Sequence, residues 1–335
     1  MEQTTRGSLR LFRVAGVDVY LHWSWFLIAI YVMVMERPAE SDYALPIWKA
    51  AEYVALFALI LLHEFGHALA CRSVGGSADR IVLWPLGGIA YVSPPPRPGA
   101  FLWSIVGGPL VNLVLVVPLF GLVLLSHTLN WGETMPDLAR FLFVLNAVNL
   151  GLLVLNLLPV YPLDGGQILH ALLWYPLGRW QSLRVVGALG MFLGGGLFVS
   201  GAFAFLALGA VGNNGAALGG MVAVIALFVA MRSFVAYQQA GAGLALLALP
   251  RHESCACPAC KVAPPKGPFW VCEHCDTRFD LFAGRGRCSA CGAWYLAPAC
   301  VHCHQKAHID RWFDPNSTAE LPPEPVHDPH ETEMS

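Results

Sequence analysis

Long apolar runs constrain the fold of this chain more than any other feature of its sequence. Six runs, the first of them short, approach the roughly 20 residues that a helix needs to cross a bilayer. They cover residues 21–35, 48–71, 101–126, 138–161, 185–211 and 216–237. Only 13% of the 335 residues are charged, against about a quarter in a soluble domain. The sequence therefore predicts an α-helical polytopic membrane protein with about six transmembrane helices, although five or seven are alternatives.

Basic residues near the ends of these runs predict how the chain is oriented. With six spans, nine arginines lie near one side of the membrane, whereas two arginines and one lysine lie near the other. Cytoplasmic loops are enriched in Lys and Arg, so both termini are expected in the cytoplasm. We therefore predict a multi-pass protein of the cell (inner or cytoplasmic) membrane.

The second apolar run contains the sequence HEFGH at residues 63–67. On a helix, this spacing brings His63 and His67 to one face, where they suit two ligands of one Zn²⁺. Glu64 is then placed to act on a water bound to the metal. Ionisable side chains at membrane depth are costly and usually mark a functional site, so a chance HExxH is the weaker interpretation.

A catalytic zinc site needs a third protein ligand, and Asp164 is the candidate. It is the only acid between Asp137 and the C-terminal module. At ~1.5 Å per residue, His67 lies roughly 7 Å and His63 roughly 13 Å from the cytoplasmic end of their span. The fourth span also runs toward the cytoplasm and ends near Asp164, so the three side chains share one membrane face. A solvated carboxylate at a helix end is the alternative.

These residues resemble the site-2 protease family of intramembrane zinc metalloproteases, in the branch that includes the sporulation factor protease. The resemblance covers about residues 8–240 and implies His63, His67 and Asp164 as zinc ligands and Glu64 as the general base. A pair of CBS modules, carried by many members of that branch, has no counterpart in this sequence. The motifs that carry the resemblance are VYLHWSW at 19–25, HEFGH at 63–67, LWPLGGIA at 83–90, GGPLVN at 107–112 and NLLPVYPLDGG at 156–166.

Two asparagines are further candidates for the catalytic site. Asn112 and Asn156 could hydrogen-bond the developing oxyanion or hold the substrate backbone. Packing between helices is the alternative, because asparagine commonly bonds across helices in membranes. Asn146 and Asn149 are interpreted as packing residues.

The segment 81–92 is a candidate for substrate binding. A substrate helix must be unwound before cleavage, and an extended peptide could then pair with an exposed strand edge. Gly87 and Gly88 would permit close approach of two backbones there. The sequence thus predicts a small β-hairpin segment, with an ordinary loop as the alternative.

Eight of the ten cysteines form four CxxC pairs near the C-terminus. Four such pairs predict two structural Cys₄ zinc sites in a module resembling a double zinc ribbon. Metal would supply most of the folding free energy of so small a module, and a reducing cytoplasm argues against disulfides. Each CxxC pair forms one knuckle of a zinc site. Sequential pairing, in which the first two knuckles share one zinc and the last two share the other, is the default, and interleaved pairing is the alternative. The pairs are Cys257 and Cys260, Cys272 and Cys275, Cys288 and Cys291, and Cys300 and Cys303.

The charge of this module argues against nucleic acid as its partner. Residues 251–311 contain eight basic and five acidic side chains. Eight thiolates and two Zn²⁺ would bring that surplus of three positive charges to −1. Phosphate binding needs a basic surface, so a protein partner is the better expectation for the ribbons.

The whole sequence predicts a transmembrane metalloprotease domain (1–248), a double zinc-ribbon module (249–312) and a disordered acidic tail (313–335). The expected function is that of an intramembrane zinc endopeptidase that cleaves transmembrane segments near the cytoplasmic face. It would use one catalytic and two structural Zn²⁺, with the bilayer and a transmembrane protein as partners. The alternative is a membrane receptor or scaffold with a vestigial zinc site, which would have no need of Glu64.

Overall fold

The computed structural model describes residues 7–27, 30, 43–45, 47–84, 87–210, 215–301, 303, 305–314 and 316. The chain divides into two compact units, Met1–Gly241 and Ala242–Ser335. This boundary lies inside a long helix, α8 (Gly215–Ala248), a few residues before the boundary that the sequence predicts. Nearly all of the predicted tail, 313–335, lies outside the described residues.

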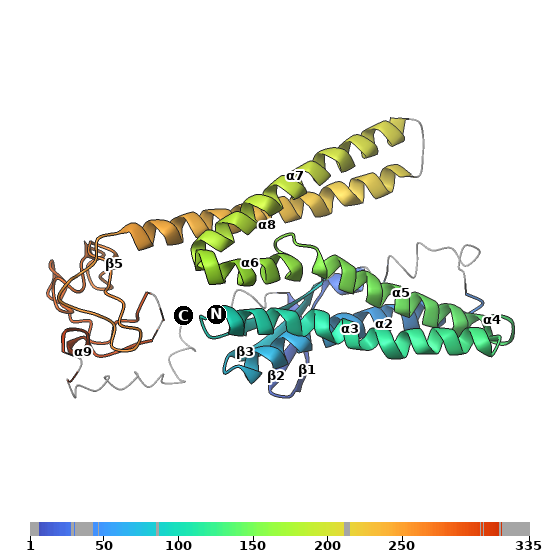
Figure 1. The fold of residues 1–335 in the computed structure, drawn as a ribbon, viewed down its shortest axis with the longest axis horizontal. Coiled ribbons are helices and arrows are strands. Elements are labelled where there is room, and N and C mark those ends of the chain that lie inside the picture. Colours follow the sequence, from blue (N-terminus) through green and yellow to red (C-terminus); the bar gives the residue numbers. More distant parts are fainter. Residues whose placement is uncertain are drawn as a thin grey trace, which may run out of the picture. The chain divides into compact units, whose positions relative to one another are not determined.

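Five helices of the described part are long and apolar enough to cross a membrane (Figure 1). Side chains on their outer faces are large and apolar; Phe192 is 80% and Val117 is 76% exposed. Such a surface is stable against lipid, so the chain is a multi-pass membrane protein. Residues 28–29 and 31–35 of the first predicted span, 21–35, lie outside the described residues. The five helices are α2 (Ile47–Ser73), α3 (Pro98–Thr128), α5 (Pro136–Leu157), α7 (Arg179–Ala210) and α8, and a short α4 (Trp131–Thr134) joins α3 to α5.

The fourth predicted span ends earlier in the structure than the sequence suggests. A turn follows α5, and a new helix, α6 (Asp164–Leu177), begins with Asp164. Pro159 and Pro162 explain the break, because proline lacks the helical N–H donor and disfavours helical backbone in the residue before it. Asp164 is therefore the first residue of α6 and not the end of the preceding span.

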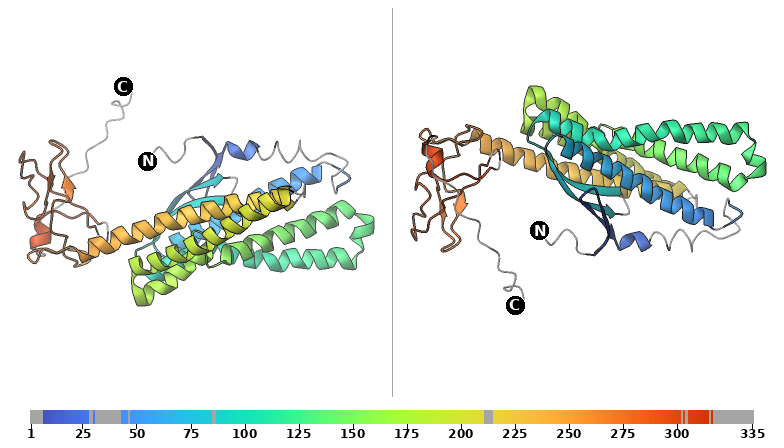
Figure 2. Two further views of the ribbon diagram at one scale, coloured as in Figure 1. Left: turned by 90° about the horizontal axis from the view of Figure 1, so that it is seen from above. Right: turned by 90° about the horizontal axis from the view of Figure 1, so that it is seen from below.

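A four-stranded sheet lies beside α2 in the first unit (Figure 2). β2 pairs in parallel with β3 because α2 returns the chain between them, and the other neighbours pair antiparallel. β4 lies at an edge of the sheet, as the sequence predicts for a strand within 81–92. In order across the sheet, the strands are β1 (Ser8–Val14), β2 (Val17–His22), β3 (Ser77–Trp84) and β4 (Gly87–Ser93).

The sheet and α2 share a buried core. Val19 of β2 and Ile81 of β3 pair across the sheet and are fully buried, and they pack with Ile60 and Ala68 of α2. This core holds the sheet against the helix that carries HEFGH, and so fixes the position of β4 beside that motif.

α2 and α3 approach each other closely at the same level. A Cβ atom added at Gly66 would lie 2.3 Å from the Gly107 carbonyl oxygen, and one at Gly107 would lie 2.4 Å from the Gly66 oxygen. Small residues at such a crossing allow two backbones to pack in a membrane. α3 also contacts α5 and α6. It therefore joins the HEFGH helix to the segments that carry the other candidate site residues.

The second unit is built around its cysteines. It contains a two-stranded sheet of β5 (Trp270–Val271) and β6 (Arg278–Phe279), and a short helix α9 (Asp310–Phe313). Each of the four knuckles contains the same kind of local hydrogen bond, in which the N–H of its first cysteine donates to the carbonyl oxygen five residues later. Each knuckle therefore forms within its own short segment. These bonds join Cys257 to Val262, Cys272 to Thr277, Cys288 to Ala293 and Cys300 to Gln305.

Candidate metal centres

The three predicted ligands meet inside the first unit, His63 and His67 from α2 and Asp164 from the start of α6. Nε2 of His63 lies 3.1 Å from Nε2 of His67 and 3.0 Å from Oδ2 of Asp164. Nε2 of His67 lies 3.4 Å from Oδ1 of Asp164. Nitrogen and oxygen ligands of a tetrahedral zinc ion are separated by about 3.3 Å, so the three side chains fit one zinc. Each is at most 8% exposed.

Both imidazole rings turn Nε2 toward the shared metal position, because Nδ1 of each ring is hydrogen-bonded on the opposite side. Nδ1 of His67 lies 3.0 Å from the Ser104 carbonyl oxygen, and Nδ1 of His63 lies 2.5 Å from Oδ1 of Asn112. A carbonyl oxygen can only accept, so Nδ1 of His67 donates and its Nε2 keeps a lone pair. Bonds of this kind orient the histidine ligands of a metal.

Glu64 lies between the two histidines and is buried. Its Oε2 accepts a hydrogen bond from the backbone N–H of Ala90 at 2.8 Å. Backbone groups alternate along a strand, so this N–H belongs to the edge of β4 that does not pair with β3. A Cβ atom at Gly88 would lie 2.3 Å from Cγ of Glu64. Only glycine at this position lets β4 approach the glutamate so closely.

The backbone of α3 closes another side of the centre at Gly108. A Cβ atom there would lie 2.3 Å from Nε2 of His67 and 2.7 Å from Nε2 of His63. A side chain at this position would occupy the space in front of both ligand nitrogens. The sequence predicts no role for this glycine, although the GGPLVN motif contains it.

The candidate asparagines have different surroundings. Asn112 is fully buried, and both its amide oxygen and its amide nitrogen are already hydrogen-bonded, to His63 and to Asn149 respectively. Asn156 is half-buried near the end of α5 and forms no side-chain hydrogen bond within the described residues. Asn149, which the sequence assigns to packing, also donates to the Asn112 carbonyl oxygen at 3.0 Å. Nothing in the sequence distinguishes it from Asn146, one turn earlier on the same apolar helix.

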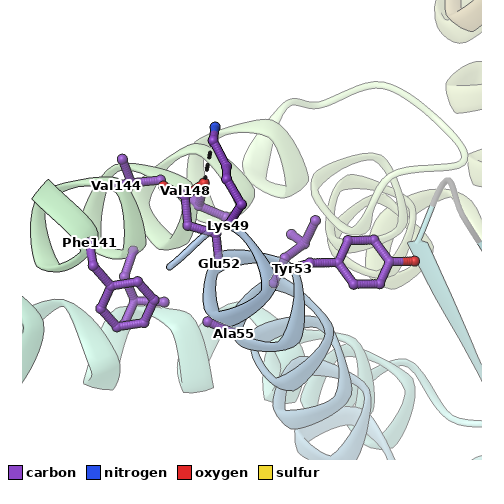
Figure 3. A pocket seen from close by; sticks show the side chains of 9 residues that line it. Lys49, Glu52, Tyr53, Ala55, Phe141, Val144 and Val148 are labelled. Carbon is purple, nitrogen blue, oxygen red and sulfur yellow. Dashed lines mark ion pairs between the residues drawn. The ribbon is translucent and has the colours of Figure 1, made fainter. Parts of the chain in front are cut away.

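A separate cavity of about 180 Å³ lies between α2 and α5 (Figure 3). An ion pair between Lys49 and Glu52, with a nitrogen–oxygen distance of 3.5 Å, belongs to its lining, which is otherwise mainly apolar. None of the three predicted ligands lines it, so this cavity is distinct from the candidate metal centre. Its lining comprises Lys49, Glu52, Tyr53, Ala55, Leu56, Phe141, Val144, Leu145 and Val148.

The eight paired cysteines of the second unit form two clusters. Their closest Sγ–Sγ distances between knuckles are 3.7, 3.7, 3.4 and 3.8 Å. Sulfur ligands around a tetrahedral zinc lie about 3.8 Å apart, whereas a disulfide bond is about 2.05 Å long. The first knuckle meets the fourth and the second meets the third, so the predicted sequential pairing is wrong. The clusters are Cys257, Cys260, Cys300 and Cys303, and Cys272, Cys275, Cys288 and Cys291.

Tyr295 supports the second of these clusters. Its hydroxyl lies 3.3 Å from Sγ of Cys272, and this hydrogen bond is the main reason that the pKa of Cys272 falls to about 6. The thiolate is the form that binds metal, so the bond favours zinc binding near neutral pH. His274, inside the second CxxC pair, is exposed, whereas His302 and His304 lie outside the described residues.

Cys255 is expected to be an unreactive thiol that binds no zinc. Burial, with a smaller effect of the Asp280 carboxylate, raises the pKa of Cys255 to about 11. At pH 8 only about one thiol in a thousand is then ionised, and alkylation should accelerate about tenfold for each pH unit up to that pKa. Mass spectrometry of iodoacetamide-treated, zinc-loaded protein measures the rate. Rapid alkylation at pH 7, or loss of zinc in Cys255→Ser, would contradict this assignment.

The apolar helices and the buried His–His–Asp cluster define an integral membrane protein with a zinc-type centre. Comparison with known proteins agrees with this class. Residues 51–138 and 127–194 match the model of peptidase family M50. Over these residues, which include the HEFGH and NLLPVYPLDGG motifs, the chain is similar to peptidase family M50.

Curated zinc metalloproteases are similar in sequence to part of this chain. A zinc metalloprotease of Methanocaldococcus jannaschii is 30% identical over 183 residues, which cover 55% of this chain and 50% of that protein. Rip3 of Mycobacterium tuberculosis is 31% identical over 212 residues, or 58% of this chain and 53% of Rip3. The chain thus spans about half the length of the curated relatives it matches. The solved site-2 protease from Methanocaldococcus jannaschii aligns with a TM-score of 0.47 and 23% identity, covering 69% of this chain and 95% of that one.

Proposed function

We propose that this protein is an intramembrane zinc endopeptidase that cleaves transmembrane segments near the cytoplasmic face of the membrane. The observation that carries the proposal is the placement of Glu64. Its buried carboxylate lies next to His63 and His67 in α2 and accepts a hydrogen bond from the edge strand β4. A general base therefore lies between a metal-type centre and a strand edge that can hold a peptide. A receptor or scaffold with a vestigial centre would have no use for this arrangement.

The chemistry of hydrolysis would be divided between the metal and the glutamate. A zinc ion held by His63, His67 and Asp164 would lower the pKa of a water toward 7 and polarise the scissile carbonyl. Glu64 would accept the proton of the attacking water and return it to the leaving amine. Asn156 is the remaining candidate for a polar contact with the substrate backbone or oxyanion.

The free edge of β4 supports the binding of an extended substrate. Backbone groups of Gly88 and Ala90 alternate with those that pair to β3, so they point to the same free edge. A peptide added there would gain main-chain hydrogen bonds next to Glu64. Gly87 adopts a φ of +141°, which favours glycine at the start of this strand.

Gly88→Ala is expected to lower kcat by about 100-fold without loss of zinc. The new Cβ atom would collide with Cγ of Glu64, and a displacement of about 1 Å at a catalytic group costs about that factor. Ile89→Ala is the matched control, because its half-exposed side chain lies on the next residue of the strand. Steady-state cleavage of a fluorescent transmembrane reporter measures both variants. If kcat fell equally in Gly88→Ala and Ile89→Ala, the effect would belong to the strand as a whole, which would contradict a specific role for Gly88.

The second unit is proposed to be a cytoplasmic zinc-ribbon module that binds a protein partner. Two Cys₄ clusters with zinc-like spacing support two structural zinc ions, and the centre in the first unit supports one catalytic zinc. Trp294 and Val301 leave 62% and 51% of their surfaces exposed on this unit. Exposed large apolar side chains of this kind suit a protein surface better than a nucleic-acid backbone.

Reconstitution tests the proposed activity directly. The full chain in liposomes would be mixed with a panel of tagged single-span proteins, and cut sites would be mapped by mass spectrometry. We expect cleavage within transmembrane segments, its loss with a zinc chelator and its recovery on addition of zinc. Cuts confined to soluble loops would contradict an intramembrane protease. Cleavage that persists in His63→Ala would contradict metal-dependent chemistry.

A further inference from the structure

A chain of hydrogen bonds links three helices behind the metal-type centre. Asn149 of α5 bonds to Asn112 of α3, which in turn bonds to His63 of α2. Both asparagine side chains are completely buried. Asparagine can donate or accept on either side, so the direction of each bond must be derived from the groups that cannot reverse.

The direction of the chain is set by one backbone group. The amide nitrogen of Asn149 lies 3.0 Å from the carbonyl oxygen of Asn112. That oxygen can only accept, so Nδ2 of Asn149 must donate to it, and Oδ1 of Asn149 must face the Asn112 side chain. Rotating the Asn149 amide by half a turn would bring two oxygens together in a buried site, at the cost of an unsatisfied polar group.

The same logic fixes the Asn112 side chain. Oδ1 of Asn149 accepts from Nδ2 of Asn112 at 2.9 Å, so Oδ1 of Asn112 must face His63. It lies 2.5 Å from Nδ1 of His63 and can only accept there. The proton of the neutral His63 ring is therefore on Nδ1, and the lone pair is on Nε2, which faces His67 and Asp164.

We infer that Asn149 and Asn112 form a directional relay that holds His63 in the tautomer able to bind the metal. Both are positioning residues, and Asn149 acts without touching the histidine. His67 needs no such relay, because the Ser104 backbone carbonyl fixes its ring directly. The inference rests on the proposed metal site of the first unit. It gives α5 a role in the centre besides leading the chain toward Asp164.

Zinc release tests the relay without any substrate. The full chain would be dialysed against graded chelator, and zinc per chain would be counted; His63→Ala defines the zinc that belongs to the membrane site. Asn149→Ala should release this zinc at a chelator concentration about 10 to 100 times lower than the parent, as loss of such supporting bonds does elsewhere. Asn149→Asp should retain it, because a buried neutral Asp can donate to the Asn112 carbonyl and accept from its amide. Asn146→Ala, one turn away on α5, is the matched control and should behave like the parent.

A second measurement reads the tautomer itself. In the zinc-loaded protein with ¹⁵N-labelled histidine, nitrogen–proton correlations should show His63 protonated on Nδ1. Asn149→Ala should shift this Nδ1 signal and speed the exchange of its proton with water, while the protein remains folded at the temperature of the measurement. Parent-like zinc release in Asn149→Ala, or equal release in Asn149→Ala and Asn146→Ala, would overturn the relay. If His63→Ala held as much zinc as the parent, the proposed metal site itself would be wrong.

Discussion

Glu64→Gln is expected to reduce cleavage of a transmembrane reporter by about 10²–10⁴-fold, the usual contribution of a general base. The glutamine amide oxygen can still accept the hydrogen bond from Ala90, which Oε2 of Glu64 accepts at 2.8 Å. Its carbonyl oxygen cannot take the proton of the attacking water at neutral pH. The packing of α2 against β4 should therefore persist while the chemical step slows. Single-turnover rates in liposomes and zinc counting measure the two effects separately.

Glu52→Gln is the matched control for this substitution. Glu52 lies on the same helix and pairs with Lys49, and it lines the separate cavity between α2 and α5. Its loss should leave the cleavage rate within about twofold, since exposed or partly exposed ion pairs contribute little. Cleavage by Glu64→Gln at the parent rate, with zinc still bound, would contradict the proposed protease mechanism.

Two double substitutions are expected to separate nested from sequential pairing of the knuckles. Cys257→Ser with Cys303→Ser removes ligands from one nested cluster and should cost one zinc per chain. Cys257→Ser with Cys275→Ser removes a ligand from each cluster and should cost two. Sequential pairing would reverse these results. Structural zinc contributes an apparent 10–16 kcal/mol in small modules, so the loss of a site should be complete rather than graded.

Zinc counting on the full chain measures this outcome, and limited proteolysis reports the folding of the second unit. Cys255→Ser is the control, because this buried thiol belongs to neither cluster, and it should retain all zinc. Loss of two zinc ions in the first double variant would contradict the nested pairing.

Much of the first unit could be predicted from sequence because its signals are local. An apolar run long enough for the bilayer predicts a helix, whatever its neighbours are. The spacing of His63 and His67 predicts a shared helical face, since a helix repeats every 3.6 residues. The end of the fourth span was predicted too late, because hydropathy alone overlooks the backbone restrictions of Pro159 and Pro162.

The contacts behind the centre could not be predicted in the same way. Asn146 and Asn149 have the same side chain in the same helix, and only the packing of α3 brings Asn112 against the second of them. The need for glycine at position 108 is likewise invisible until α3 crosses α2 in front of the two histidines. Both depend on the distance and rotation between helices, which residues far apart in the chain determine together.

The cysteines show most clearly which features the sequence predicts and which features only the tertiary structure decides. Sequence by itself determined the four knuckles and the HEFGH helix, because each forms through bonds within a few residues. Tertiary structure alone decided that Cys257 shares a cluster with Cys303, and that Asp164 starts α6 opposite the two histidines. The physical reason is that all four knuckles have the same local structure, so only the path of the chain between them can select their partners.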